Sequence, residues 1–302
     1  MADLRINLCG VELKNPVIPA SGTFGFGREY NEIYDISVLG AVATKGLTLA
    51  PRLGNPVPRI AESRGVILNA VGLQNPGVEH FIEHDLAWLR AKTRVVANVA
   101  GSTLEDYGNI CKRLNGLVDF IELNISCPNV KCGGMAFGIR PESVEAVTRI
   151  AKENCPDTPL MVKLSPNVES ISEIARAAER GGADCISLIN TLTGMAIDIE
   201  RRKPILANNT GGVSGGGIKA IAVRMVYEAS RAVKIPVVGM GGIICAEDAI
   251  EFLMAGATAV QVGTQNFTDT LACPKIIEGL DKWCVCHGIE KVSELTGTLK
   301  LN

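Results

Sequence analysis

The chain has 302 residues, of which 47% are hydrophobic, 21% are charged and 32 are glycine. This composition is typical of a compact protein with a large core and many tight turns, and it excludes an intrinsically disordered chain. Thirty basic against 32 acidic residues give a formal charge of -2 with no dense basic stretch, so nucleic acid is not an expected partner.

The first ten residues, MADLRINLCG, contain no basic region followed by an apolar run, and no stretch of about 18 apolar residues occurs anywhere. We therefore expect a cytoplasmic protein with no membrane partner. The ten cysteines are scattered, and most should be reduced and buried like small apolar side chains. The tightest group, WCVCHG at 283–288, is too cramped for a typical zinc site and should belong to a C-terminal helix, so no metal is expected.

The chain begins with LRINLCGVELKN, which alternates in hydrophobicity and turns at Gly10. This pattern predicts a β-hairpin outside the main repeat, placed to plug the bottom of the fold. After it, eight short β-branched runs alternate with amphipathic stretches, as in a parallel sheet of βα units. The runs end at Ala20, Lys45, Val99, Ile125, Ser165, Asn190, Gly241 and Gly263.

Between these runs, the stretches at 141–154 and 246–257 have the spacing of helices. Eight is the number of strands that closes a barrel, so we predict an α/β protein with a (β/α)8 TIM barrel as a single domain over residues 1–302. Two long connections, roughly 46–93 and 191–217, should cover or build the site.

Each predicted strand carries an unusual residue at or just beyond its C-terminal end, where barrel enzymes place their sites. A Lys or Asn buried in an apolar strand costs several kcal/mol unless it finds partners, so the repeated placement indicates a site. The residues concerned are Ser21, Lys45, Asn98, Asn124, Lys163, Asn190, Gly241, Gly242, Gly263 and Thr264.

The glycine-rich turns in VVGMGGI and VGT favour a phosphate-bearing ligand held by backbone amides, although they could also be simple tight turns. The glycines of TGGVSGGGIK could bring backbone N–H groups to a ligand or form a flexible lid. Lys163, and similarly Lys45, could be a fixed cation that stabilises an anion developing on a bound ring. Either could instead be the Schiff-base lysine of an aldolase-like lyase. The neighbouring asparagines favour a planar, amide-rich ring.

The segment NISCPNVKCGG places Cys127 just beyond the fourth strand, where its thiol would face the barrel mouth. His80, His84 and His287 fall in helical stretches away from the strand ends, so Cys127 is the leading candidate for a general base. A thiol with an ordinary pKa of about 8.5 would serve best in mildly alkaline conditions.

Eight segments carry a family resemblance: KGLTLAPRLGNPVPRI, NAVGLQNPG, ELNISCPNVKCGG, VKLSPN, INTLTGM, PILANNTGG, VVGMGGI and VGTQNF. Over nearly the whole chain they resemble the class 1 dihydroorotate dehydrogenases, and within that class the NAD-linked type 1B. The resemblance implies a flavoprotein that oxidises (S)-dihydroorotate to orotate in the de novo synthesis of UMP. It implies that Cys127 removes the C5 proton while hydride passes from C6 to N5 of FMN, and that NAD+ is the final acceptor.

The resemblance also implies the residues that hold each ligand. Those for FMN are Ser21, Lys45, Gly46, Asn98, Asn124, Lys163, Ile189, Gly215, Gly241, Gly242, Gly263 and Thr264. Those for orotate are Lys45, Asn69, Ala70, Val71, Gly72, Leu73, Asn124, Asn129, Asn190 and Thr191. The resemblance further implies that Lys163 balances the charge of the reduced flavin. The loop SGGGIK departs from the family pattern, which has a larger residue after the first glycine, and this should loosen the loop.

The electrons from this oxidation must pass to an acceptor. The sequence shows neither a dinucleotide fingerprint nor cysteines spaced for an iron-sulfur cluster. A partner subunit is therefore expected. The resemblance implies that this electron-transfer subunit carries FAD and [2Fe-2S], in a heterotetramer built on a homodimer of catalytic chains. The alternatives are a related FMN barrel that acts on dihydropyrimidines, a Schiff-base lyase that uses Lys163, and a non-catalytic phosphate-binding barrel, which would leave Cys127 unexplained.

Overall fold

Eight parallel strands form the central sheet of the molecule, of which the computed structural model describes residues 1–125 and 137–302. The strands are β3 (Val17–Pro19), β4 (Ala41–Ala43), β7 (Arg94–Val99), β8 (Phe120–Asn124), β9 (Leu160–Lys163), β10 (Cys185–Leu188), β15 (Val237–Met240) and β16 (Ala259–Val262). They lie in the order β3-β16-β15-β10-β9-β8-β7-β4. The first and last strands in this order are β3 and β4. The amide of Gly40, just before β4, donates to the carbonyl of Val17 on β3 at 3.1 Å. The sheet is nearly closed, which confirms the predicted (β/α)8 barrel.

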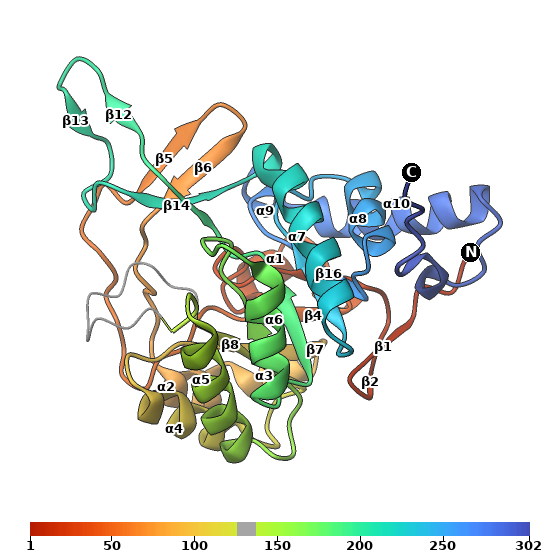
Figure 1. Cartoon of the computed structure of the whole chain (residues 1–302), viewed down its shortest axis with the longest axis horizontal. Helices are drawn as coiled ribbons and strands as arrows, with labels where there is room; N and C mark the ends of the chain where they lie inside the picture. The colour runs from red at the N-terminus through yellow and green to blue at the C-terminus, as the bar shows by residue number, and fades with distance from the viewer. Residues whose placement is uncertain (126–136) are drawn as a thin grey trace.

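Helices between successive strands surround the barrel (Figure 1). The longer ones are α2 (Val78–His84), α3 (Leu86–Arg90), α4 (Leu104–Leu114), α5 (Pro141–Asn154), α6 (Ile171–Arg180), α7 (Lys219–Ala232), α8 (Ala246–Met254) and α10 (Ala272–Cys286). Single turns are α1 (Arg28–Asn31), α9 (Gln265–Thr268) and the 3₁₀ helices η1 (Ile36–Val38), η2 (Gly216–Ile218) and η3 (Val292–Leu295).

Local signals account for the helix boundaries. Pro141 stands in the first turn of α5, where its missing N–H is not needed, and the helix covers the predicted range. Thr103 and Asp106 form a capping box at the start of α4. The predicted C-terminal helix is α10, and its last turn contains Cys284 and Cys286.

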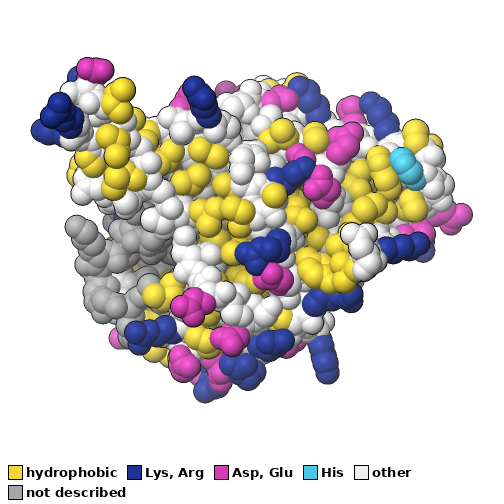
Figure 2. Space-filling model, turned by 45° about the horizontal axis from the view of Figure 1, so that its top comes forward, with side chains coloured by type: hydrophobic (Ala, Val, Ile, Leu, Met, Phe, Trp, Pro, Cys, Tyr) yellow, Lys and Arg dark blue, Asp and Glu magenta, His cyan; other side chains and the backbone are white. Residues whose placement is uncertain are grey.

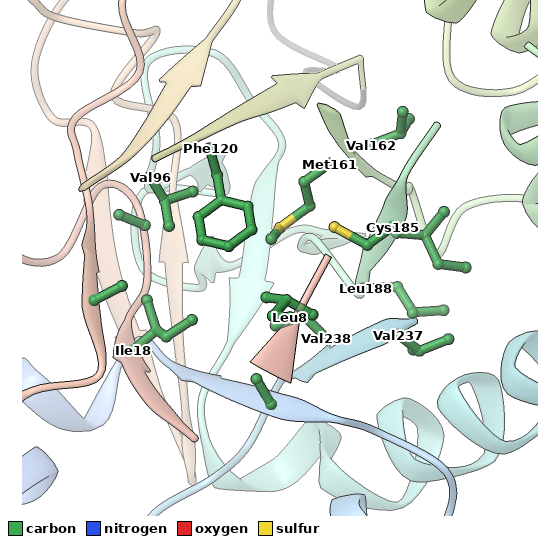
Figure 3. Close-up of a cluster of buried hydrophobic side chains, with 14 of the residues drawn as sticks. Leu8, Ile18, Val96, Phe120, Met161, Val162, Cys185, Leu188, Val237 and Val238 are labelled. Atoms are coloured by element: carbon green, nitrogen blue, oxygen red, sulfur yellow. The ribbon is translucent and has the colours of Figure 1, made fainter. Parts of the chain in front are cut away.

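The N-terminal hairpin consists of β1 (Ile6–Leu8) and β2 (Val11–Leu13). Its turn residues Cys9 and Gly10 have φ values of 52° and 85°, as a two-residue hairpin turn of type I′ requires. The Cys9 thiol donates to the carbonyl of Asp184, just before β10, at 3.3 Å. Figure 3 shows Leu8 among apolar side chains of the barrel, including Val238. The hairpin therefore packs against the N-terminal ends of the strands, as predicted.

The two long connections also form a second sheet, which was not predicted from the sequence. Its antiparallel strands are β5 (Ile60–Ser63), β6 (Val66–Asn69), β11 (Leu192–Gly194) and β14 (Gly211–Ser214), in the order β11-β14-β6-β5. A further hairpin, β12 (Ile197–Asp198) and β13 (Lys203–Pro204), projects beyond it at the upper left of Figure 1.

Hydrophobic side chains are exposed on this projecting part, at the upper left of Figure 2. Met195, Ile197, Ile199 and Ile205 keep between 37% and 79% of their surface in solvent. Several apolar side chains exposed together are typical of a surface that contacts another protein. Among the described residues, no helix is both long enough and apolar enough to cross a membrane.

Candidate active site

A cavity of about 690 Å³ lies at the C-terminal ends of the barrel strands. Its walls come partly from these strand ends and partly from the second sheet, which contributes Ile67, Asn69 and Ser214. A ligand in this position would contact both the rigid barrel and the long connections. The cavity is large enough for a cofactor together with a small substrate, since ligand pockets span about 300–1,000 Å³.

The predicted site residues converge on this cavity although they are spread from position 21 to position 264. Seventeen of them line it: Ser21, Lys45, Gly46, Asn69, Val71, Gly72, Leu73, Asn124, Lys163, Ile189, Asn190, Thr191, Gly215, Gly241, Gly242, Gly263 and Thr264. Asn98 and Ala70 do not line it, and Cys127 and Asn129 lie outside the described residues. The convergence follows from the barrel, because parallel strands bring their C-terminal ends to one face.

The two predicted residues that do not line the cavity lie just behind it. Asn98 is fully buried on β7, and its Oδ1 accepts a hydrogen bond from Asn124 Nδ2 at 3.4 Å. Ala70 follows β6 and packs with Ala61, Leu68 and Leu206 in a small apolar cluster of the second sheet. Asn98 therefore supports a residue of the cavity floor.

Three polar side chains from neighbouring strands form the floor of the cavity. Asn124 at the end of β8 pairs in register with Lys163 at the end of β9, and both are more than 90% buried. Asn190, just beyond β10, donates through Nδ2 to Asn124 Oδ1 at 3.4 Å. This arrangement presents an ammonium group and amide groups together, and these suit a planar ring with carbonyl and N–H groups.

Lys45 follows β4 and lines the same cavity. Burial lowers its pKa from the ordinary value, and the positive charge of Arg59 lowers it further. Both effects disfavour the ammonium form. An anionic ligand beside Lys45 would reverse this balance, so the residue is suited to binding a carboxylate.

A glycine turn joins the cavity to the start of α7. Gly241 and Gly242 have φ values of 117° and 83°. A Cβ on Gly242 would lie 2.7 Å from the backbone N and Cα of Lys219, the first residue of α7. The turn therefore packs directly against the start of α7, where η2 leads into the helix and where Gly215 and Gly216 line the cavity. The start of a helical segment favours an anion such as phosphate. A glycine cradle of this kind fits the phosphate of a nucleotide cofactor.

Some residues of the site were not predicted from the sequence. Glu62, Ser63 and Ile67 line the cavity from the second sheet, and no local sequence pattern predicts that sheet. Glu122 was also missed, although a carboxylate in the middle of the apolar strand FIELN is a signal by itself. It is fully buried beneath the cavity floor.

Comparison with known proteins gives a consistent result. Residues 3–283 match the family model described as dihydroorotate dehydrogenase. A protein named dihydroorotate dehydrogenase B (NAD(+)), catalytic subunit, from Alkaliphilus metalliredigens is 54% identical, over 98% of this chain and 99% of the relative. Proteins of the same name are 53% identical in Caldicellulosiruptor saccharolyticus, over 99% of this chain and 100% of the relative, and in Geobacillus sp. strain WCH70, over 98% and 96%.

Proposed function

The chain belongs to the dihydroorotate dehydrogenase family, and on that premise we propose that it oxidises (S)-dihydroorotate to orotate in the de novo synthesis of pyrimidines, as an FMN-dependent catalytic subunit. The observation that carries this proposal is the convergence of the predicted flavin and orotate positions on one cavity. Neither the family match nor the relatives' names point to a dihydropyrimidine substrate or to a Schiff-base lyase.

The whole chain, 1–302, would form one FMN-binding barrel domain. FMN, when bound, supplies the acceptor for the hydride that leaves C6 of dihydroorotate. The turn at Gly241 and Gly242 and the N-terminus of α7 would hold its phosphate, and Lys163 would compensate negative charge on its ring. The other flavin contacts would come from the strand ends that line the cavity.

For the substrate, Lys45 would pair with the carboxylate of orotate, while Asn69, Asn124 and Asn190 would bind the amide groups of its ring. Asn129 would add a further amide from the segment outside the described residues. Cys127, in the same segment, would remove the proton from C5 as a thiolate. Loss of the proton and loss of the hydride together account for the new double bond.

An electron-transfer partner follows from the same premise. The relatives are named catalytic subunits of an NAD(+) enzyme, so a second subunit should pass electrons from this chain to NAD+. We propose that it carries FAD and [2Fe-2S], that two catalytic chains form a homodimer within a heterotetramer, and that the complex is cytoplasmic. The exposed apolar side chains around β12 and β13 support contact with another chain.

The test of the function is the visible spectrum of the purified chain before and after anaerobic addition of L-dihydroorotate, with dihydrouracil as the comparison. We expect an FMN band that only dihydroorotate bleaches. A flavin bleached only by dihydrouracil would change the substrate. A colourless protein that FMN cannot reconstitute, but that borohydride traps on Lys163 with a carbonyl substrate, would replace the proposal with the lyase.

The Gly242→Ala variant tests the phosphate cradle. We expect FMN affinity to fall at least about tenfold, which corresponds to about 1.4 kcal/mol, because the new methyl group would push against the backbone of Lys219. Fluorescence titration of the apoprotein with FMN measures the change. Gly288→Ala is the matched control, since Gly288 also has positive φ, 67°, but has no atom within 4 Å of the position that its new methyl group would take and does not line the cavity. Equal affinities in the two variants would contradict the cradle.

The lowered pKa of Lys45 predicts how substrate binding depends on pH. The ammonium charge is lost as pH rises through this lowered value, so KM for dihydroorotate should rise at a pH below the ordinary lysine value of 10.5. Over the same range kcat should rise as the Cys127 thiol ionises. The pH dependence of kcat therefore reports Cys127, and that of KM reports Lys45. In Lys45→Arg the side chain stays charged, and KM should remain flat. An identical alkaline rise in KM in both proteins would show that Lys45 is not the titrating group.

A further inference from the structure

Glu122 is a carboxylate in the interior of the barrel, on the strand that ends in Asn124. Its residue is fully buried. Because side chains two residues apart on a strand share a face, Glu122 lies one layer below Asn124 and therefore below the cavity floor. Phe120, two residues earlier on β8, shares this face and belongs to the apolar core, where Figure 3 shows it near Met161.

Four side chains from four other strands approach this carboxylate. Oε2 accepts from Asn98 Nδ2 at 2.6 Å and lies 3.7 Å from the ammonium of Lys163. Oε1 accepts from Ser187 Oγ at 2.8 Å and from Gln261 Nε2 at 2.6 Å. Gln261 belongs to β16, four strands away from β8 in the sheet order, so the contact crosses the inside of the barrel.

These partners indicate that Glu122 is ionised. All four present a donor to it, and a protonated acid would instead need an acceptor for its own hydrogen. A buried carboxylate persists only when it is paired and hydrogen-bonded, and here Lys163 supplies the opposite charge.

Asn98 and Lys163, the two partners of Oε2, are both predicted flavin positions. Asn98 also accepts a hydrogen bond from Asn124 on the cavity floor, and Lys163 lines the cavity itself. The proposed role of Lys163 is to stabilise negative charge on the flavin ring. A carboxylate 3.7 Å behind the ammonium opposes that effect, since the pair acts on the cavity as a dipole rather than as a full positive charge.

We propose that Glu122 is a positioning residue that orients Asn98 and Lys163 beneath the flavin and lowers the reduction potential of FMN by offsetting the charge of Lys163. The inference rests on the proposed FMN site. A lower potential has a functional consequence: the reduced flavin gives up its electrons more readily toward a weak oxidant such as NAD+. It is harder to reduce by dihydroorotate for the same reason.

The test compares the two-electron reduction potential of FMN in wild type and Glu122→Gln, measured near neutral pH against reference dyes during reductive titration. Gln keeps the shape of the side chain and removes its charge. We expect the reduction equilibrium to shift at least tenfold toward reduced FMN, a potential about 30 mV more positive. Ser187→Ala is the matched control, because it removes one hydrogen bond to Oε1 and leaves the charge in place. It should leave the potential unchanged.

A purely structural role would lower the stability of both variants and move neither potential, and that result would overturn the inference. The measurement needs no dihydroorotate, so it does not depend on the proposed substrate. A wild-type chain that cannot bind FMN would contradict the proposed function itself. A normal wild-type potential with an unchanged Glu122→Gln potential would contradict the inference alone.

If Glu122→Gln does not fold, thermal unfolding of the apoprotein still tests the charge. Lys163→Met should be less stable than the double variant Lys163→Met/Glu122→Gln, because only the single variant buries an unpaired carboxylate. Equal stability of the two variants would mean that Glu122 carries no charge, and the inference would fail.

Discussion

The Cys127→Ser variant is expected to purify with FMN bound and to lose about 10²–10⁴-fold in kcat. The physical reason is the basicity of the side chain at working pH. A thiol with a pKa of about 8.5 is partly ionised in mildly alkaline solution, whereas a serine hydroxyl is not, so it is a far poorer proton acceptor. FMN binding should survive because the proposed flavin contacts come from other residues.

Rapid mixing of each protein with dihydroorotate under anaerobic conditions, between pH 7 and 9, measures this loss as the rate at which the flavin band bleaches. The bleaching rate of the wild type should increase with pH as the thiol ionises, and that of the variant should stay low throughout. Cys286→Ser is the matched control, because Cys286 is exposed at the end of α10 and does not line the cavity. Near wild-type rates in Cys127→Ser would assign the base to another residue.

The Lys163→Met variant is expected to lose about 3–5 kcal/mol of stability and most of its FMN affinity. The side chains of Lys163 and Glu122 are 5% and 0% exposed, so removal of the ammonium leaves a buried carboxylate without its opposite charge. The same change removes the cation that would face the flavin ring.

Urea unfolding of the apoprotein, together with FMN titration, separates these two effects. Lys282→Met is the matched control, since Lys282 pairs with Glu278 at 3.8 Å on the surface, where both side chains are at least 70% exposed. It should change neither stability nor FMN affinity, because exposed ion pairs are strongly screened. A Lys163→Met protein as stable as this control would mean that the buried ion pair contributes nothing.

Much of the fold could be predicted because its signals are local. Each barrel strand is a short β-branched run, and α5 is marked at its start by Pro141. The N-terminal hairpin follows from alternation interrupted at Gly10. The positions of the site residues could be predicted in turn, because a parallel barrel collects the C-terminal ends of its strands on one face.

The second sheet could not be predicted in the same way. Its central strand β14 reads GGVS, which has little intrinsic preference for a strand, and it pairs with β6 about 145 residues earlier, as in the pair Gly212 and Asn69. Such pairing depends on where the barrel holds the two connections. The question left open for TGGVSGGGIK is answered in part: its first half is a paired strand, and Gly215 after it lines the cavity.

The sequence by itself determined the barrel, the ends of its strands and the residues that gather there, because period, turn residues and strand length are properties of adjacent positions. Only the tertiary structure decided which side chains meet inside the barrel. Glu122 appears in the sequence as a lone acid in an apolar run, and it gains its partners Asn98, Lys163, Ser187 and Gln261 from four other strands. Contacts that cross the barrel interior depend on closure of the sheet, and no local pattern encodes them.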